Sequence, residues 1–513
     1  MPARGSRCHA AERSGCAVSV RGPAEAAGPW SCSGVVLSWD PAVVLCHGAV
    51  FAALLRDGPA AWARREALPP GALRPGLRVR VLRPAGPGGR PRRHEARLLA
   101  LVPCAAFAEA LAGAAAGAEP WRFGGEPAAE PRALGWFGLL RAPGLDGGGG
   151  GGWTARGAAA ALRKGQALVA CGSPFGALCP DLFLNTLSAG VLSNAAGPRN
   201  ALLLTDARCL PGTEGGGVFA AAEARLVGVV AAPLCWKGRE CLGLALVCSL
   251  DAILSSAAAI LEQAGAVPPP LPPPDEDEDE EEAAGLMPAL LRHAALVQCG
   301  SAWGSGALLG PRLLLTCRHV LQPGARVTVR AAAAGGAALA GRVVFASAEE
   351  SPFDVAVVEL ERSLPGLAPP RLAARFRPGE AVSVLSFGGL GGACGPSVTA
   401  GVLSAVVAVA GRPVMLQTTC AVQAGASGAP LFATRTGHLL GIVASNAKDT
   451  SVGATYPHLN FSVPITLLRP ALARYRRTGD PAAFAALHGA AAEGARAVWR
   501  LQRAPPGVPF SKL

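Results

Sequence analysis

The sequence holds one serine whose surroundings suit nucleophilic catalysis. Ser427 lies in the turn Gly-Ala-Ser-Gly-Ala-Pro, which covers residues 425–430. A serine hydroxyl attacks a carbonyl only when a base removes its proton. Glycines allow a tight turn in which the N–H groups of Gly425 and Ser427 point together at a developing oxyanion. The alternative is an ordinary polar turn, because this tetrapeptide pattern is short.

His319 and Asp354 are the candidate partners of this serine. His319 ends the run LLLTCRHV, and Asp354 opens the run FDVAVVEL. A neutral imidazole accepts a serine proton and returns it to a leaving amine, and a carboxylate beside the imidazole fixes its tautomer. Asp354 is the sole aspartate between His319 and Ser427. A core histidine and a turn aspartate are the simpler alternatives, but the order His, Asp, Ser favours catalysis.

The elements that must position these residues are short strands. Runs such as LLLTC, RVTVR, VAVVEL and AVSVLSF are rich in leucine and β-branched residues and end at Gly, Pro or Ser. That pattern is typical of barrels and sandwiches. Helical periodicity appears only at about 465–475 and 480–502. We therefore predict an all-β fold.

The chain also repeats itself. Residues 189–193 and 400–404 are both AGVLS, and similar glycine, cysteine and apolar landmarks surround them in the same order. This alignment predicts two tandem double β-barrel domains. It places Glu214 opposite Ser427, His47 opposite His319, and Gly138 opposite Asp354. We expect the first copy to be degenerate, with a structural role for His47 and a packing, regulatory or recruiting role for the domain.

A proline-rich and acidic segment separates the two copies. Residues 267–282 read VPPPLPPPDEDEDEEE; prolines favour an extended chain, and consecutive acids repel one another. We predict a degenerate domain over 1–266, a linker over 267–285, a catalytic domain over 286–478, and a C-terminal helix and tail over 479–513.

Composition excludes several classes of protein. Of the 513 residues 50% are hydrophobic and 16% are charged, so the chain can bury cores and is not a disordered protein. The net charge is +12, but arginine is scattered along the chain, which disfavours nucleic-acid binding. The 15 cysteines form no CxxC pair and show no zinc-finger spacing. We therefore expect free thiols, no metal, no secretory leader, no membrane span and an intracellular location.

The three motifs resemble those of the trypsin-like serine proteases. TCRHV is similar to the histidine motif of that superfamily, FDVAVVEL to its aspartate motif and GASGAP to its serine motif, and TTCAVQAGASGAPLF is closest to the HtrA/Deg branch. The resemblance covers about residues 290–470. It implies a serine endopeptidase without a cofactor, in which Ser427 is the nucleophile, His319 the general base and Asp354 the orienting carboxylate. It also implies an oxyanion hole at Gly425 and Ser427.

Departures from the family pattern bear on substrate choice. Ala426 replaces the aspartate that in secreted trypsins receives a new N-terminus, so that activation switch is excluded. The resemblance implies a substrate pocket at Ala421, Ile442, Val443 and Ala444, without a buried acid, which favours a small or apolar residue before the scissile bond. We expect the substrate to add a strand along residues 441–445.

The chain ends in Ser511, Lys512 and Leu513, a peroxisomal address that an import receptor reads. With two copies, a linker and this ending, the chain resembles the trypsin-like leader-peptide-processing proteases of peroxisomes. That resemblance implies a location in the peroxisomal matrix, imported matrix proteins as substrates, and processing of the chain itself. The bond between Cys104 and Ala105 is the candidate self-cleavage site.

Two other functions stay open at this point. Both copies could be inactive, which would make the chain a peptide-binding or chaperone-like peroxisomal protein. Nucleic-acid binding through arginine would instead give strongly salt-dependent affinity. The oligomeric state, including a homo-oligomer, is open as well.

Overall fold

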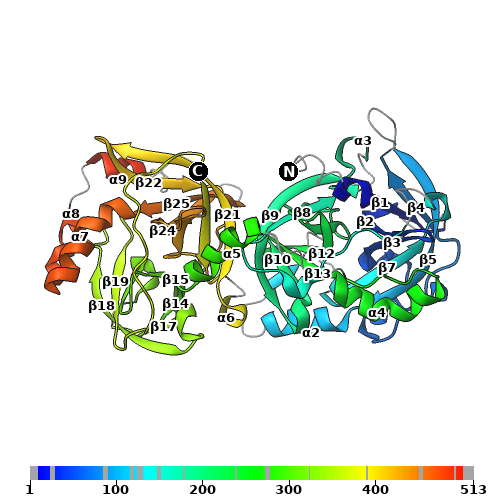
Figure 1. The fold of residues 1–513 in the computed structure, drawn as a ribbon, viewed down its shortest axis with the longest axis horizontal. Coiled ribbons are helices and arrows are strands. Elements are labelled where there is room, and N and C mark those ends of the chain that lie inside the picture. Colours follow the sequence, from blue (N-terminus) through cyan, green and yellow to red (C-terminus); the bar gives the residue numbers. More distant parts are fainter. Residues whose placement is uncertain are drawn as a thin grey trace. The chain divides into compact units, whose positions relative to one another are not determined.

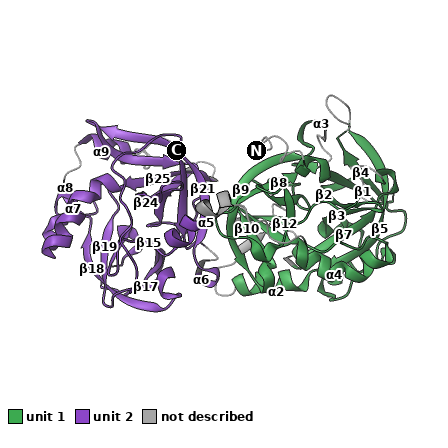
Figure 2. Cartoon of the chain, viewed as in Figure 1, with its two compact units in different colours: residues 1–239, 244–276 green, residues 240–243, 277–513 purple. Residues whose placement is uncertain are grey.

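The computed structural model describes residues 10–23, 29–84, 91–115, 121–123, 131–146, 152–176, 180–236, 240–271, 278–322, 324–388, 391–449, 454–489 and 493–500. The chain forms two compact units (Figure 2). Unit 1 comprises residues 1–239 and 244–276, and unit 2 comprises residues 240–243 and 277–513. Each unit is described by itself.

Unit 1 begins with a closed barrel whose strands pair in the order β1-β2-β3-β7-β5-β4 (Figure 1). Its strands are β1 (Gly15–Arg21), β2 (Trp30–Trp39), β3 (Ala42–His47), β4 (Arg78–Arg83), β5 (Arg92–Pro103) and β7 (Trp136–Arg141). Alternate residues of these strands face the interior, where Val18, Val36 and Leu140 are fully buried. Burial of such side chains is the main stabilising contribution.

The second sheet of unit 1 has the strand order β11-β8-β9-β10-β13-β12-β6. β11 also pairs with β12, so the first six strands of this order form a closed ring. β6 lies at the margin of the ring. Its strands are β6 (Trp121–Phe123), β8 (Ala167–Gly172), β9 (Thr186–Ala196), β10 (Leu202–Thr205), β11 (Gly217–Ala220), β12 (Arg225–Trp236) and β13 (Glu240–Ser249). The helices of unit 1 are α2 (Ala105–Ala115), α3 (Pro180–Phe183), α4 (Leu250–Gln263), η1 (Gly48–Leu54), η2 (Gly58–Ala63), η3 (Pro70–Ala72), η4 (Pro131–Gly135), η5 (Pro143–Leu145), η6 (Ala159–Ala161) and η8 (Pro198–Asn200).

Unit 2 holds two closed barrels with the orders β14-β15-β16-β19-β18-β17 and β20-β21-β22-β25-β24-β23. The first has β14 (Ala294–Cys299), β15 (Ala302–Leu308), β16 (Leu313–Thr316), β17 (Val327–Ala331), β18 (Ala338–Ala346) and β19 (Ala356–Leu360). The second has β20 (Ala381–Ser386), β21 (Ser397–Val409), β22 (Arg412–Thr418), β23 (Pro430–Ala433), β24 (Leu439–Asp449) and β25 (Ala454–Pro464). Each strand of the two barrels of unit 2 has a counterpart in unit 1, and the counterparts pair in the same order. The predicted all-β fold with two tandem double barrels is therefore confirmed.

The helices of unit 2 lie before its barrels, between their strands and after them. They are α5 (Glu278–Leu291), η9 (Arg318–Val320), η10 (Ala332–Ala334), α6 (Gly391–Cys394), α7 (Ile465–Thr478), η11 (Pro481–Phe484), α8 (Ala486–Gly489) and α9 (Glu493–Arg500). α5 begins inside the acidic run, where we expected a linker; glutamate is a good helix former, and negative charge near a helix N-terminus is favourable. None of the described helices combines the length and apolar character needed to cross a bilayer.

Candidate active site

His319 and Asp354 meet at one end of the first barrel of unit 2. β16 pairs with β19 so that Thr316 lies opposite Ala356; the turn after β16 and the loop before β19 therefore emerge together. The backbone N–H of His319 donates to Asp354 Oδ1 at 3.0 Å, and His319 Nδ1 is hydrogen-bonded to Asp354 Oδ2. These two contacts fix the imidazole and leave its Nε2 as the free reactive edge.

Asp354 is held in its ionised form. Its side chain is 26% exposed, and burial acts to raise the pKa of its carboxyl. The hydrogen bonds and charge of His319, with a contribution from the charge of Arg318, outweigh burial and bring the pKa of Asp354 below its usual value. The carboxylate therefore stays negative beside the imidazole at neutral pH.

The loop that carries Ser427 presents two unused backbone donors. Its glycines adopt positive φ, +87° at Gly425 and +85° at Gly428, a conformation that favours glycine. The N–H groups of Ala426 and Gly428 donate to Gln423 at 3.0 Å and Val443 at 2.7 Å. Within the described ranges, the N–H groups of Gly425 and Ser427 have no acceptor. These are the two donors that the sequence analysis assigned to the oxyanion hole.

Ser305 holds this loop in place, and this role of Ser305 was not predicted from the sequence. Its hydroxyl donates to the carbonyl of Gly425 at 2.7 Å and accepts from the N–H of Phe387 at 2.9 Å. Its own N–H donates to the carbonyl of Ser427 at 2.8 Å. The internal repeat held the signal, because a serine precedes the aligned glycine in both copies, Ser33 in the first and Ser305 in the second.

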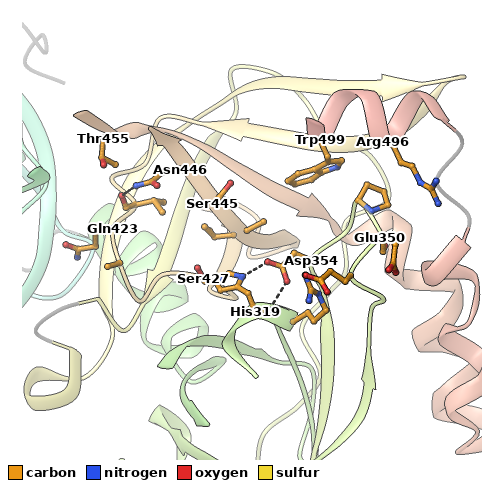
Figure 3. Close-up of a pocket in the computed structure, with 18 residues that line it drawn as sticks. His319, Glu350, Asp354, Gln423, Ser427, Ser445, Asn446, Thr455, Arg496 and Trp499 are labelled. Carbon is orange, nitrogen blue, oxygen red and sulfur yellow. Dashed lines mark hydrogen bonds and ion pairs between the residues drawn. The ribbon is translucent and has the colours of Figure 1, made fainter. Parts of the chain in front are cut away.

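His319, Asp354 and Ser427 line one cleft of about 790 Å³ (Figure 3). In the part of the chain that the structure describes, no hydrogen bond joins Ser427 to His319. Such bonds are often long without substrate and tighten when substrate binds. The cleft thus collects an oriented imidazole, a hydroxyl and two free N–H donors.

Two of the four predicted pocket residues line this cleft. Val443 and Ala444 do, whereas Ala421 and Ile442 are buried, at 2% and 0% exposure, and do not reach it. The lining that was not predicted includes apolar residues such as Val422 and Trp499 and a set of uncharged polar residues, namely Gln423, Ser445, Asn446 and Thr455. Oε1 of Gln423 and Oγ of Ser445 are buried without a hydrogen-bond partner, so this wall offers polar atoms to a ligand.

The edge available to a substrate strand is shorter than predicted. At Gly441 and Ile442, β24 pairs with β23 on one side and β25 on the other, and the N–H of Val443 donates to Ala429. A strand paired on both sides cannot accept a third neighbour. Strand addition is therefore restricted to Ala444 onward.

A metal site at the same place fits the residues poorly. Cys317, His319 and Asp354 carry candidate ligand atoms within 4.8 Å of one another. However, burial and the charge of Asp354 raise the pKa of Cys317 well above its usual value, and its thiol donates to the carbonyl of Val443 at 3.2 Å. Metals bind the thiolate, so a buried thiol held in its protonated form is a weak ligand.

In unit 1, two of the predicted equivalences are shifted by two residues. Gly34 pairs with Cys46, and Cys46 pairs with Gly138. In unit 2 the same register places Thr316 opposite Ala356. His47 therefore occupies the place of Cys317, and Trp136 that of Asp354. The cause is that the hairpin of β2 and β3 is longer than the hairpin of β15 and β16, and that it contains a bulge between Val36 and Ser38. Equal spacing between the aligned glycines and histidines in the sequence does not reveal this difference.

The nucleophile loop of unit 1 keeps its shape, but its own side chain fills it. Gly212 and Gly215 have φ of +94° and +88°, and Ser33 donates to the carbonyl of Gly212 at 2.7 Å, as Ser305 does in unit 2. The carboxylate of Glu214 accepts from the N–H of Gly212 at 2.7 Å. Burial raises the pKa of Glu214 against the opposing effect of these backbone donors. An internal carboxylate thus occupies the oxyanion position of the degenerate copy.

His47 gives unit 1 a pH-dependent stability. Burial lowers the pKa of His47 to about 4, against a weaker contact with the carbonyl of Leu134. The unfolded chain binds a proton below about pH 6.5, whereas the folded chain does not until about pH 4, so stability falls as pH decreases through this window. We expect the titration of His47 to lower the free energy of unfolding of unit 1 by about 2 kcal/mol between pH 7 and pH 5.

His47→Gln removes that titration. Urea unfolding of the full chain at pH 7 and pH 5, in wild type and variant, measures the difference for the transition of unit 1. An equal pH dependence in both proteins would contradict the assignment of His47 as a buried neutral histidine.

The candidate self-cleavage bond joins a buried cysteine to the first, exposed residue of α2. Cys104, between β5 and α2, is 1% exposed, and its N–H donates to Gly135 at 2.7 Å. Its sulfur lies 3.6 Å from that of Cys248. A protease would reach this bond only after local unfolding. The targeting residues 511–513 lie outside the described residues.

One family model matches the part of the chain that holds this site. Residues 304–442 match the trypsin-like peptidase domain, a range that includes His319, Asp354 and Ser427. The chain resembles two solved structures, Rv3671c from M. tuberculosis in its inactive form and the serine endoprotease from Yersinia pestis. Both are 22% identical to this chain with a TM-score of 0.31. The match to Rv3671c covers 40% of this chain and 97% of that structure. The match to the Yersinia pestis protease covers 39% of this chain and 68% of that structure.

Two curated relatives match over the full length. A protein of Mus musculus named peroxisomal leader peptide-processing protease is 48% identical over 580 aligned residues, covering 99% of each chain. The Homo sapiens protein of the same name is 47% identical over 570, again covering 99% of each. With the peptidase domain, these matches make the chain a serine endopeptidase. The chain belongs to the family of peroxisomal leader peptide-processing proteases.

Proposed function

We propose that the chain is a peroxisomal endopeptidase that removes leader peptides from imported matrix proteins through an acyl-enzyme at Ser427. The observation that carries the proposal is the imidazole of His319, fixed by Asp354 in the same cleft as Ser427. The two unengaged N–H groups beside Ser427 support it further. The class of substrate comes from the names of the relatives.

Acylation begins when His319 Nε2 takes the proton of the Ser427 hydroxyl as its oxygen attacks the scissile carbonyl. The carbonyl oxygen becomes negative and accepts hydrogen bonds from the N–H groups of Gly425 and Ser427. Asp354 stabilises the imidazolium that forms. His319 then gives its proton to the leaving amine, and the C–N bond breaks.

Deacylation repeats these steps with water as the nucleophile. His319 takes a proton from the water, the same two N–H groups hold the second oxyanion, and Ser427 leaves with its proton restored. Every charge that develops meets a group already in place, so the chain needs no cofactor for this reaction.

Self-processing and the import receptor belong to the same proposal. Cys104 is buried, and Ala105 is exposed but begins α2, so we expect self-cleavage at this bond to occur in a chain that has opened locally or has not finished folding. The tripeptide at 511–513 would bring the chain into the matrix through the receptor that reads it.

A map of protein N-termini in peroxisomes tests the substrate assignment. Cells carry either the wild-type chain or Ser427→Ala, and mass spectrometry compares the N-termini of matrix proteins. We expect leader-bearing proteins to keep their leaders with Ser427→Ala, and the chain itself to stay uncut. Identical termini in the two samples, with both proteins present in peroxisomes, would overturn the assignment.

A further inference from the structure

The last helix of unit 2 forms part of the wall of the catalytic cleft. α9 follows both barrels in sequence, yet Arg496 and Trp499 line the same cleft as His319 and Ser427. Figure 3 shows the ring of Trp499 beneath the helix, beside the cleft, and the side chain of Arg496 directed to the side of the cleft that carries Glu350. α9 therefore adds residues to the cleft that neither barrel supplies.

Trp499 anchors α9 to both barrels of unit 2. Its indole N–H donates to the carbonyl of Val414 in β22 at 3.0 Å. Its ring meets that of Phe353 edge to face, with 6.5 Å between centroids, and Phe353 directly precedes Asp354. The side chain is only 7% exposed. Because a buried indole with its N–H paired has few alternative positions, the helix is fixed relative to the catalytic pair.

The segment before α9 holds the loop that carries Asp354. The hydroxyl of Ser351 donates to the carbonyl of Leu487 at 2.8 Å, and the N–H of Ala348 donates to His488 Nδ1 at 3.0 Å. Together with the Trp499 contact, these bonds join the C-terminal segment to residues 348–353. The side chains of α9 are thus preorganised with respect to the cleft.

Arg496 brings a positive charge that no neighbour neutralises. Among the residues that the structure describes, no carboxylate lies within ion-pair distance of its guanidinium, and its Nε is shielded from solvent without a hydrogen-bond partner. Glu349 and Glu350 line the same cleft but are solvent-exposed. A second guanidinium, that of Arg318, also lines the cleft. Arg496 is half-buried, and a guanidinium can bind a carboxylate through two parallel hydrogen bonds.

The direction of the substrate strand indicates which residues would meet Arg496. Strand addition is available from Ala444, and Ala444 and Ser445 line the cleft together with α9. The acyl part of a substrate would run along this edge before reaching Ser427, whereas the leaving amine must lie on the side where His319 delivers its proton. Side chains on the acyl side therefore pass nearest to α9.

We propose that Arg496 determines specificity by binding an acidic side chain of the substrate on the amino-terminal side of the scissile bond, with Trp499 as the fixed wall of that subsite. This inference rests on the proposed function and names a feature of its substrates. The ligand is a carboxylate carried by an extended peptide.

Peptide kinetics test the proposal with the full-length chain. A peptide that the wild-type protein cleaves, taken from a synthetic library, is remade with Glu, Gln or Lys at each of the four positions before the scissile bond. The same set is measured with Arg496→Gln, Arg496→Glu and Arg477→Gln. The last variant is the matched control, because Arg477 is exposed on α7 and does not line the cleft.

At one of these positions, we expect the wild-type chain and Arg477→Gln to prefer Glu over Gln by about tenfold in kcat/KM. Arg496→Gln should lose the preference for Glu over Gln, and labelling of its Ser427 by a fluorophosphonate probe shows that the variant is folded. Arg496→Glu should prefer Lys. The inference would be overturned if the wild-type chain showed no preference for Glu at any of the four positions, or if the preference persisted in Arg496→Gln. Failure of the proposed function looks different, because then no peptide is cleaved and Ser427 is unreactive.

Discussion

Replacing Ser427 with alanine is expected to lower turnover of peptide substrates on the order of 10⁶-fold, because its hydroxyl, beside the two unengaged N–H donors, forms the acyl-enzyme. The oxyanion donors and the imidazole remain, so some residual rate above that of water is expected. The loss should lie in kcat, since the hydroxyl acts on the reacting carbonyl and contributes little to binding. Continuous assays with a quenched fluorescent peptide measure it.

The matched control for this variant is Ser301→Ala. Ser301 is exposed in the turn between β14 and β15, does not line the cleft, and accepts a hydrogen bond from Gln322. Turnover close to that of wild type is expected. If folded Ser427→Ala hydrolysed the peptide at the wild-type rate, the acyl-enzyme mechanism would be wrong.

Asp354→Asn is expected to reduce kcat about 10⁴-fold while leaving KM nearly unchanged. Asp354 Oδ2 is hydrogen-bonded to Nδ1 of the imidazole, so an amide in its place can turn its NH₂ toward the ring. That would stabilise the tautomer that carries the proton on Nε2, and this tautomer cannot accept the proton of Ser427.

The pH dependence of this variant follows from the direction of the shift. Because the pKa of Asp354 lies below its usual value, the carboxylate stabilises the folded chain at pH values above that usual value, and this contribution is lost only as pH falls through the lower folded pKa. Asp354 therefore stays ionised in the wild-type chain from about pH 5 to 8, and its own protonation does not lessen the deficit of Asp354→Asn in that range. Asp57→Asn, an exposed change in unit 1, is the control. A loss below tenfold in folded Asp354→Asn would contradict the role of Asp354.

The fold, and the meeting of His319, Asp354 and Ser427 in one cleft, could be predicted because their signals are local. Each of His319, Asp354 and Ser427 adjoins a short apolar run, and such runs became β16, β19 and β23. Pairing of β16 with β19 then brings the first two together, which the family resemblance anticipated. The internal repeat predicted the two double barrels because each copy must bury the same alternating positions.

The equivalences within unit 1 could not be predicted from spacing. Gly34 precedes His47 by the same number of residues as Gly306 precedes His319, but a bulge in β2 and a longer hairpin place His47 at the position of Cys317. Register depends on pairing between strands, and a bulge leaves no fixed trace in sequence spacing.

The site residues that were not predicted from the sequence reach the site through contacts between distant segments of the chain. Ser305 contacts Gly425 across 120 residues, and Trp499 contacts Val414 across 85. Neither residue belongs to a motif, and a tryptophan in a helical stretch is usually a core residue. Their roles follow from where the barrels bring the chain, which propensity and periodicity do not specify.

Labelling with a fluorophosphonate probe tests the central claim most directly. The account predicts one labelled residue in the full-length chain, mapped by mass spectrometry to Ser427, with labelling lost in His319→Ala and strongly slowed in Asp354→Asn. Labelling of Ser427 that proceeds equally well in folded His319→Ala, or a folded wild-type chain that the probe leaves unmodified, would contradict it.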